Sequence, residues 1–105
     1  MTTVKFIYDN NKPTGFEISG HATASAKDTQ GKIVCSAVSS SAYMAANTIT
    51  DIIKAKCDVY ADYGVMKLRL LQDSPESEMI LRGLKLHLDE LSKQYKNFIT
   101  ISEDK

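Results

Sequence analysis

Residues 65–71 carry the strongest structural constraint in the chain, a strict two-residue alternation of side chains. The two sets are Met66, Leu68 and Leu70 against Val65, Lys67 and Arg69. Because successive side chains of a strand point to opposite faces, this pattern predicts a strand with one buried and one solvent-facing side. Strands of this kind are typical of antiparallel sheets whose second face is wet.

Four other segments also carry strand patterns: residues 4–8, 16–19, 57–62 and 98–101. The run of turn-forming residues at 9–13 joins the first two, which predicts a hairpin. The charged tail at 103–105 is expected to fray.

Two segments have apolar residues spaced by three and four, which predicts helices. The first covers residues 34–55 and has the series Val38, Ala42, Ala45, Ile49 and Ile52 or Ile53. The second starts at Ser74 and Pro75, a helix cap followed by proline at the first helical position. The element order is ββαββαβ. We therefore expect a single α+β domain over residues 1–105, with two helices packed on one face of a mostly antiparallel sheet.

The composition excludes several partner classes. The chain has 13 basic and 13 acidic residues, a balance that argues against direct nucleic-acid binding and against a membrane partner. No segment approaches the roughly 18 apolar residues of a membrane span. The N-terminus has no secretion signal, so we expect a cytoplasmic protein.

The two cysteines and two histidines of the chain lack zinc-site spacing, so no metal and no cofactor are expected.

One segment places a histidine at a strand end and a cysteine at the predicted start of a helix. His21 follows Gly20, and Cys35 follows a small, polar segment at 22–32 that we expect to be a mobile loop. Unpaired N–H groups and the positive dipole end at a helix N-terminus favour a thiolate and can hold an oxyanion. A nearby imidazole would complete a nucleophile–base pair. Taken alone this signal is weak, because a lone cysteine and a lone histidine are more often structural.

The same segment resembles the ribosomal-processing cysteine proteases, the Prp family. The resemblance rests on Gly20-His21-Ala22 and on Ile33-Val34-Cys35-Ser36-Ala37-Val38-Ser39. It implies a homodimeric endopeptidase that removes the N-terminal extension from the precursor of a large-subunit ribosomal protein. Cys35 would be the nucleophile of a thioester mechanism and His21 its base. Ser39 would support the site from the same helix face.

Three further residues complete the predicted site. Gly20 belongs to the motif before the histidine, and Ser36 would share an oxyanion-binding backbone with Cys35. The family's acidic residue falls on Lys32 in this chain. Asp28 is a candidate replacement for that carboxylate, or Lys32 itself would hold the thiolate by charge.

Two other functions stay open at this point. The substitution at Lys32 motivates a non-catalytic, ribosome-associated binding module on the same scaffold. A thiol redox protein is disfavoured, because no resolving cysteine lies near Cys35. Cys57 is expected to be a structural thiol, and His87 is expected to have no role.

Overall fold

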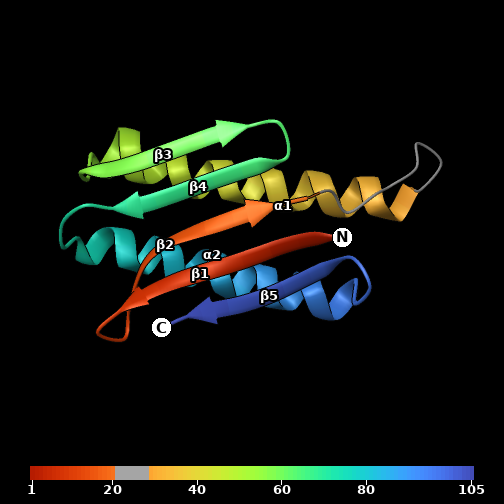
Figure 1. The fold of residues 1–105 in the computed structure, drawn as a ribbon. Helices are drawn as coiled ribbons and strands as arrows, with labels where there is room; N and C mark the ends of the chain where they lie inside the picture. The colour runs from red at the N-terminus through yellow and green to blue at the C-terminus, as the bar shows by residue number, and fades with distance from the viewer. Residues whose placement is uncertain (21–28) are drawn as a thin grey trace.

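The computed structural model describes residues 1–20 and 29–105, which form one sheet and two long helices (Figure 1). In chain order the elements are β1 (Thr2–Asp9), β2 (Lys12–Ser19), α1 (Thr29–Asn47), the π-helical η1 (Thr48–Ile53), β3 (Cys57–Asp62), β4 (Val65–Leu70), α2 (Pro75–Gln94) and β5 (Ile99–Asp104). The predicted order ββαββαβ and the α+β class are confirmed.

The five strands form a single sheet in the order β3-β4-β2-β1-β5. Only the β1–β5 pairing is parallel, so the sheet is mostly antiparallel, as predicted. Both helices lie behind the same face (Figure 1). The opposite face carries a row of charges in which Glu17 contacts Lys5 at 3.8 Å and Lys67 at 3.7 Å.

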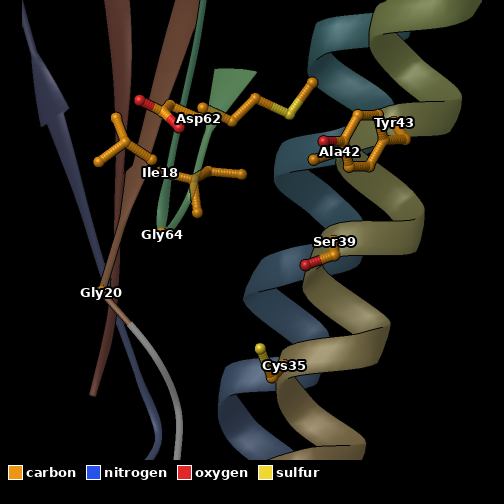
Figure 2. A pocket seen from close by; sticks show the side chains of 10 residues that line it. Ile18, Gly20, Cys35, Ser39, Ala42, Tyr43, Asp62 and Gly64 are labelled. Carbon is orange, nitrogen blue, oxygen red and sulfur yellow. The ribbon is translucent and has the colours of Figure 1, made fainter.

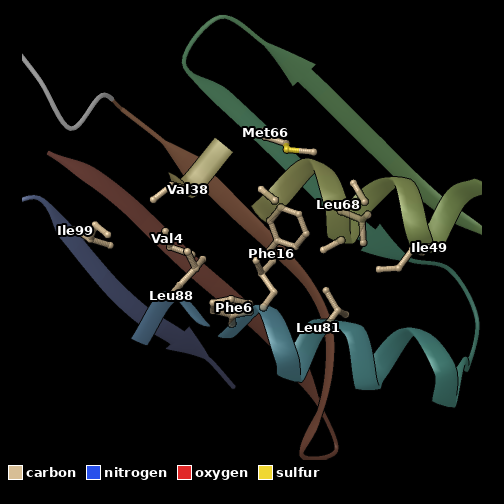
Figure 3. Packing of buried hydrophobic residues seen from close by; sticks show 14 of the residues in the cluster. Val4, Phe6, Phe16, Val38, Ile49, Met66, Leu68, Leu81, Leu88 and Ile99 are labelled. Atoms are coloured by element: carbon tan, nitrogen blue, oxygen red, sulfur yellow. The ribbon is translucent and has the colours of Figure 1, made fainter. Parts of the chain in front are cut away.

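The hydrophobic core fills the space between the sheet and the helices (Figure 3). Its largest fully buried side chains are Phe6, Phe16 and Leu68 from the sheet, Ile49 from η1, and Leu81 and Leu88 from α2. These apolar residues follow the period of two in the strands and of three to four in the helices, which is why the sequence pattern located them.

The start of α1 differs from the prediction. The helix begins at Thr29, so residues 29–32 are helical and do not belong to a loop. Gly31 accounts for the difference. It is buried, as are Val34, Val38 and Ala42, so the buried face of α1 begins one turn before Val34. A glycine carries no apolar side chain and therefore hides this turn from a periodicity analysis. Residues 22–28 of the predicted loop lie outside the described residues.

The end of the first helix also differs. The α-helix stops at Asn47, and η1 continues to Ile53 before Lys54 adopts a left-handed φ of 60°. A π-turn adds one residue between hydrogen-bonded partners. After the buried Ile49, it is therefore Ile53 that packs against the core, whereas Ile52 is 76% exposed.

The first hairpin and the C-terminal strand were predicted less completely, whereas the β3–β4 turn lies at residues 63–64 as expected. The β1–β2 turn consists of Asn10 and Asn11, both with positive φ, and β2 already starts at Lys12. At the C-terminus, Glu103 and Asp104 pair with β1 and so belong to β5, whereas we expected this tail to fray. No helix among the described residues is long and apolar enough to cross a membrane.

The cap of α2 gives a direct test of this local structure. The Ser74 hydroxyl accepts the Ser77 backbone N–H at 3.3 Å and donates to the Ser77 hydroxyl at 2.7 Å, and both residues are buried. Ser74→Ala should lower the free energy of unfolding by about 1–2 kcal/mol, because it leaves these groups unpaired. Urea unfolding measures the loss. Ser40→Ala, at an exposed position of α1, is the control and should change stability by less than about 0.5 kcal/mol.

Candidate active site

A pocket of about 150 Å³ lies between α1 and one end of the sheet (Figure 2). Its walls come from elements far apart in the sequence: the end of β2, one side of α1, and the turn between β3 and β4. The lining residues are Ile18, Gly20, Cys35, Ser39, Ala42, Tyr43, Asp62, Gly64, Val65 and Met66. The structure thus brings together three of the predicted site residues: Gly20, Cys35 and Ser39.

The helix α1 contributes two of the predicted site residues to the pocket, Cys35 and Ser39. Cys35 and Ser39 are four residues apart, which places them one above the other on a helix. Both side chains point from α1 toward the sheet (Figure 2), as predicted for a shared face. Cys35 is a free cysteine, half-buried, and packs against the hydrophobic core, whereas Ser39 is exposed. The sulfur is thus anchored by packing and still borders the pocket.

Gly20 fixes the end of β2 at the opposite wall. Its N–H donates to the carbonyl oxygen of Gly64 at 3.0 Å, which ties β2 to the β3–β4 turn. Its φ of +83° is in the left-handed region, and a Cβ at this position would lie 2.6 Å from the carbonyl oxygen of Met1. Only glycine fits here without a backbone shift. The chain continues from this fixed point to His21.

The position of Cys35 within the helix corrects part of the predicted chemistry. Cys35 lies more than one turn beyond Thr29, the first residue of α1, so the prediction that it starts the helix is wrong. Only the first four N–H groups of a helix lack intrahelical partners, and the dipole effect is confined to the first turn. The N–H groups of Cys35 and Ser36 are therefore not available for an oxyanion. Ser36 itself is exposed and does not line the pocket.

The predicted base and carboxylate cannot be placed in the same way. His21 and Asp28 lie outside the described residues, so their pairing with Cys35 stays a prediction. Lys32 is described: it is exposed on the first turn of α1, three residues before Cys35. Residues at this spacing are neighbours on a helix surface, so an ammonium group can lie near the sulfur.

The pocket also contains residues that the sequence did not reveal. Tyr43 and Met66 extend the walls, and Asp62 forms part of the rim. The Asp62 carboxylate accepts the Tyr63 backbone N–H at 2.7 Å and the Tyr60 hydroxyl at 3.2 Å, and it is directed away from α1 (Figure 2). It therefore shapes the rim and does not face the sulfur. The sequence holds no local signal for Asp62 and Met66, because the β3–β4 hairpin reaches the pocket only by pairing of β4 with β2. Tyr43 lies four residues after Ser39 on α1, so helical spacing could have found it.

Cys57 occupies a different place. It is the first residue of β3, is half-buried, and packs against the core, as expected for a structural thiol. Burial, followed by the charge of Asp58, raises the pKa of the Cys57 thiol above its ordinary value. Neither Cys57 nor His87 lines the pocket of Cys35. Among the described residues, no group of three or more metal-binding side chains comes together.

The geometry defines a class of site. A free thiol borders a pocket on an α+β scaffold, and the second cysteine lies outside that pocket. Cys35 is therefore a candidate nucleophile, and the described residues bring no second cysteine beside it.

The family follows from the sequence comparison. The family described as cysteine protease Prp matches residues 1–100, and the chain belongs to this family. No curated protein sequence matches the chain significantly.

Solved structures have the same fold. The essential ribosomal processing protease Prp from S. aureus, in complex with a covalently linked product peptide, superposes with a TM-score of 0.88 at 22% identity, over 99% of this chain and 100% of that chain. The same protease in complex with a substrate peptide gives a TM-score of 0.86 at 22% identity, over 99% and 100% of the two chains. SMU.848 from Streptococcus mutans gives 0.84 at 21% identity, over 98% of this chain and 93% of that chain.

Proposed function

We propose that this chain is a cysteine endopeptidase that removes the N-terminal extension from the precursor of a large-subunit ribosomal protein. The observation that carries the proposal is the Cys35 thiol, which faces a pocket between α1 and the strand ends in a chain of the Prp cysteine protease family. The S. aureus relative, whose fold is the same, has been crystallised with substrate and product peptides. By analogy, the pocket beside Cys35 would receive the peptide bond to be cut.

The proposed reaction runs through a thioester. The Cys35 sulfur attacks the scissile carbonyl carbon, while the His21 imidazole takes the thiol proton and passes it to the leaving amine. Water then attacks the thioester carbonyl, which releases the new carboxylate and restores the thiol. Ser39, one turn further along α1, offers a hydroxyl to the bound peptide. Because the N–H groups of Cys35 and Ser36 are used within the helix, the oxyanion needs other donors.

Lys32 supports the thiolate in this scheme. The resemblance puts it where the family has an acidic residue, and its exposed position one turn before Cys35 suits a charge that stabilises an anionic sulfur. The carboxylate that orients the His21 imidazole would then come from Asp28, or the reaction would proceed without such a carboxylate. We place the reaction in the cytoplasm, where ribosomal proteins are made, and expect the enzyme to act as a homodimer.

A second candidate function is a ribosome-associated binding module that has kept the scaffold without catalysis. Lys32 is also the observation that favours it, because the family's acidic residue is missing. The two candidates differ in the reactivity of Cys35. A nucleophile must ionise readily, whereas a binding module has no need of a reactive thiol.

Thiol labelling distinguishes these two candidates. Iodoacetamide at neutral pH should alkylate Cys35 at least about tenfold faster than Cys57, because burial and Asp58 keep Cys57 protonated. Labelling of Cys57 should accelerate as the pH rises toward its raised pKa, since the thiolate is the reacting form. Mass spectrometry of the single variants Cys35→Ser and Cys57→Ser assigns each rate. Equally slow labelling at both positions would favour the binding module.

A further inference from the structure

One carboxylate stands at the mouth of the Cys35 pocket. Of the described residues that line the pocket, Asp62 is the only aspartate, glutamate, lysine or arginine. Figure 2 shows Cys35 at one end of the pocket and Asp62 with Tyr43 at the other end. The Asp62 carboxylate is directed away from α1, and so toward a peptide that leaves the pocket at this end (Figure 2). Charge at such a position acts on the choice of substrate and not on the chemistry at the sulfur.

Within the described part of the chain, Asp62 forms no ion pair. In the β3–β4 register it lies opposite the apolar Val65. Lys67 lies opposite Tyr60, two residues away, but its ammonium group contacts Glu17 at 3.7 Å. Opposite charges across a strand pair attract each other, and Asp62 has no such partner across the ladder. The carboxylate is therefore open to a cation from another molecule.

The hydrogen bonds of Asp62 hold the carboxylate in place and leave room for more donors. Oδ1 accepts the Tyr63 backbone N–H at 2.7 Å, and Oδ2 accepts the Tyr60 hydroxyl at 3.2 Å. An ionised carboxylate has about four lone-pair positions, so each oxygen can accept a further N–H. Because the carboxylate is already fixed in the free protein, less entropy is lost when a ligand binds.

Tyr60 supplies an aromatic surface beside this carboxylate. The two residues are two positions apart on β3, so their side chains project on the same face. Tyr60 is 54% exposed. The face of a tyrosine ring attracts a lysine or arginine head group, and a carboxylate accepts its N–H groups in charge-assisted hydrogen bonds. An aromatic ring next to an unpaired carboxylate thus suits a basic side chain better than an apolar or acidic one.

The length of α1 indicates how far from the cut bond this basic residue lies. Cys35 and Tyr43 are both on α1, and the eight residues between these positions span about 12 Å at 1.5 Å per residue. An extended peptide advances about 3.3 Å per residue. The end of the pocket with Tyr43 and Asp62 is therefore three or four peptide residues from a bond held at the Cys35 sulfur.

We propose that Asp62 and Tyr60 form a subsite for a lysine or arginine of the substrate, three or four residues beyond the cut bond on the mature side. Charge selects the mature side. The proposed substrate is a ribosomal protein, and proteins that bind RNA carry basic residues that contact its phosphates. The inference rests on the proposed function and adds a charge preference to it. A precursor with a basic mature N-terminus is then distinguished from other peptides before the sulfur attacks.

Two peptides that differ only in charge test the subsite. Both span the junction between the extension and the mature protein. One has lysine at the third and fourth positions after the cut bond, and the other has glutamine at both. The full-length wild type should cleave the lysine peptide with a kcat/KM at least about fivefold higher at low salt. Because salt screens exposed charges, this ratio should approach one in about 0.5 M sodium chloride.

Substitutions at Asp62 assign the preference to this side chain. Asp62→Asn keeps an acceptor for the Tyr63 N–H, so the turn should persist, whereas the lysine-to-glutamine ratio should fall to about one. Asp62→Lys should reverse the preference, so that a third peptide with glutamate at the two positions is cleaved faster than the lysine peptide. Tyr60→Ala should lower the ratio about twofold. Circular dichroism verifies that each variant is folded.

Asp104→Asn is the matched control. Asp104 is exposed on β5, the strand at the opposite edge of the same sheet. It is the same residue type but lies outside the pocket. The variant should therefore keep the wild-type ratio between the lysine and glutamine peptides.

Binding without cleavage separates this inference from the proposed function. Fluorescence anisotropy with Cys35→Ala should show at least about fivefold tighter binding of the lysine peptide than of the glutamine peptide. Equal affinities, equal cleavage by the wild type, or a lysine preference that survives Asp62→Lys each overturn the subsite while cleavage stands. A preference that appears only when the lysines precede the cut bond overturns the assigned position. A wild type that cleaves none of the peptides disproves the proposed function instead, whatever the affinities.

Discussion

Replacing Cys35 with alanine should abolish cleavage of a precursor peptide. We expect kcat/KM to fall at least about a thousandfold, because the variant has no atom that can form the thioester. The fold should persist, since Cys35 is only half-buried and alanine suits a helix interior. The measurement is mass spectrometry of a peptide that spans the junction between the extension and the mature protein.

Cys57→Ala is the matched control for this experiment. Cys57 is also half-buried and packs against the same core, but it lies outside the pocket. It should therefore keep close to wild-type kcat/KM. Wild-type cleavage by Cys35→Ala would disprove the nucleophile assignment. Equal losses in both variants would show that the fold and not the thiol accounts for the activity.

Replacing Phe16 with alanine should produce the largest loss of stability. Phe16 is fully buried on β2, and its ring lies 6.4 Å from that of Phe6, tilted by 51°. Truncating a buried phenylalanine typically costs about 3–5 kcal/mol through lost burial and the remaining cavity. Since small domains are stabilised by only about 5–15 kcal/mol, much of this variant should unfold at moderate temperature. Thermal and urea unfolding, followed by circular dichroism, measure the change.

Ile52→Ala is the control for the core substitution. Ile52 is also large and apolar, but it is 76% exposed on η1. Its truncation should change the free energy of unfolding by less than about 0.5 kcal/mol. Similar losses for Phe16→Ala and Ile52→Ala would contradict the core described above.

Much of the fold was predictable because local periodicity and tertiary burial agree. The alternation around Met66 and Leu68 gave the correct buried face of β4, and Ser74 was correctly predicted as the cap of α2. One error arose where a residue without an apolar side chain takes a core position. Gly31 is buried in the first turn of α1, so the helix starts earlier than the apolar series suggests.

The site was only partly predictable for a different reason. Cys35 and Ser39 share a helix, so their common face follows from their spacing. Gly64 and Met66 reach the same pocket only because β4 pairs with β2 across a long connection. No rule of spacing along the chain predicts which strands become neighbours. The oxyanion hypothesis failed because it depended on the exact start of α1, and helix ends are the least certain feature of a sequence pattern.

The enclosure of Cys35 within a regular helix limits how this region can vary during evolution. Each residue turns the helix by about 100°, so one inserted residue between Val34 and Val38 would rotate the thiol away from its pocket or the apolar residues away from the core. Insertions and deletions should therefore be excluded from this stretch in active relatives.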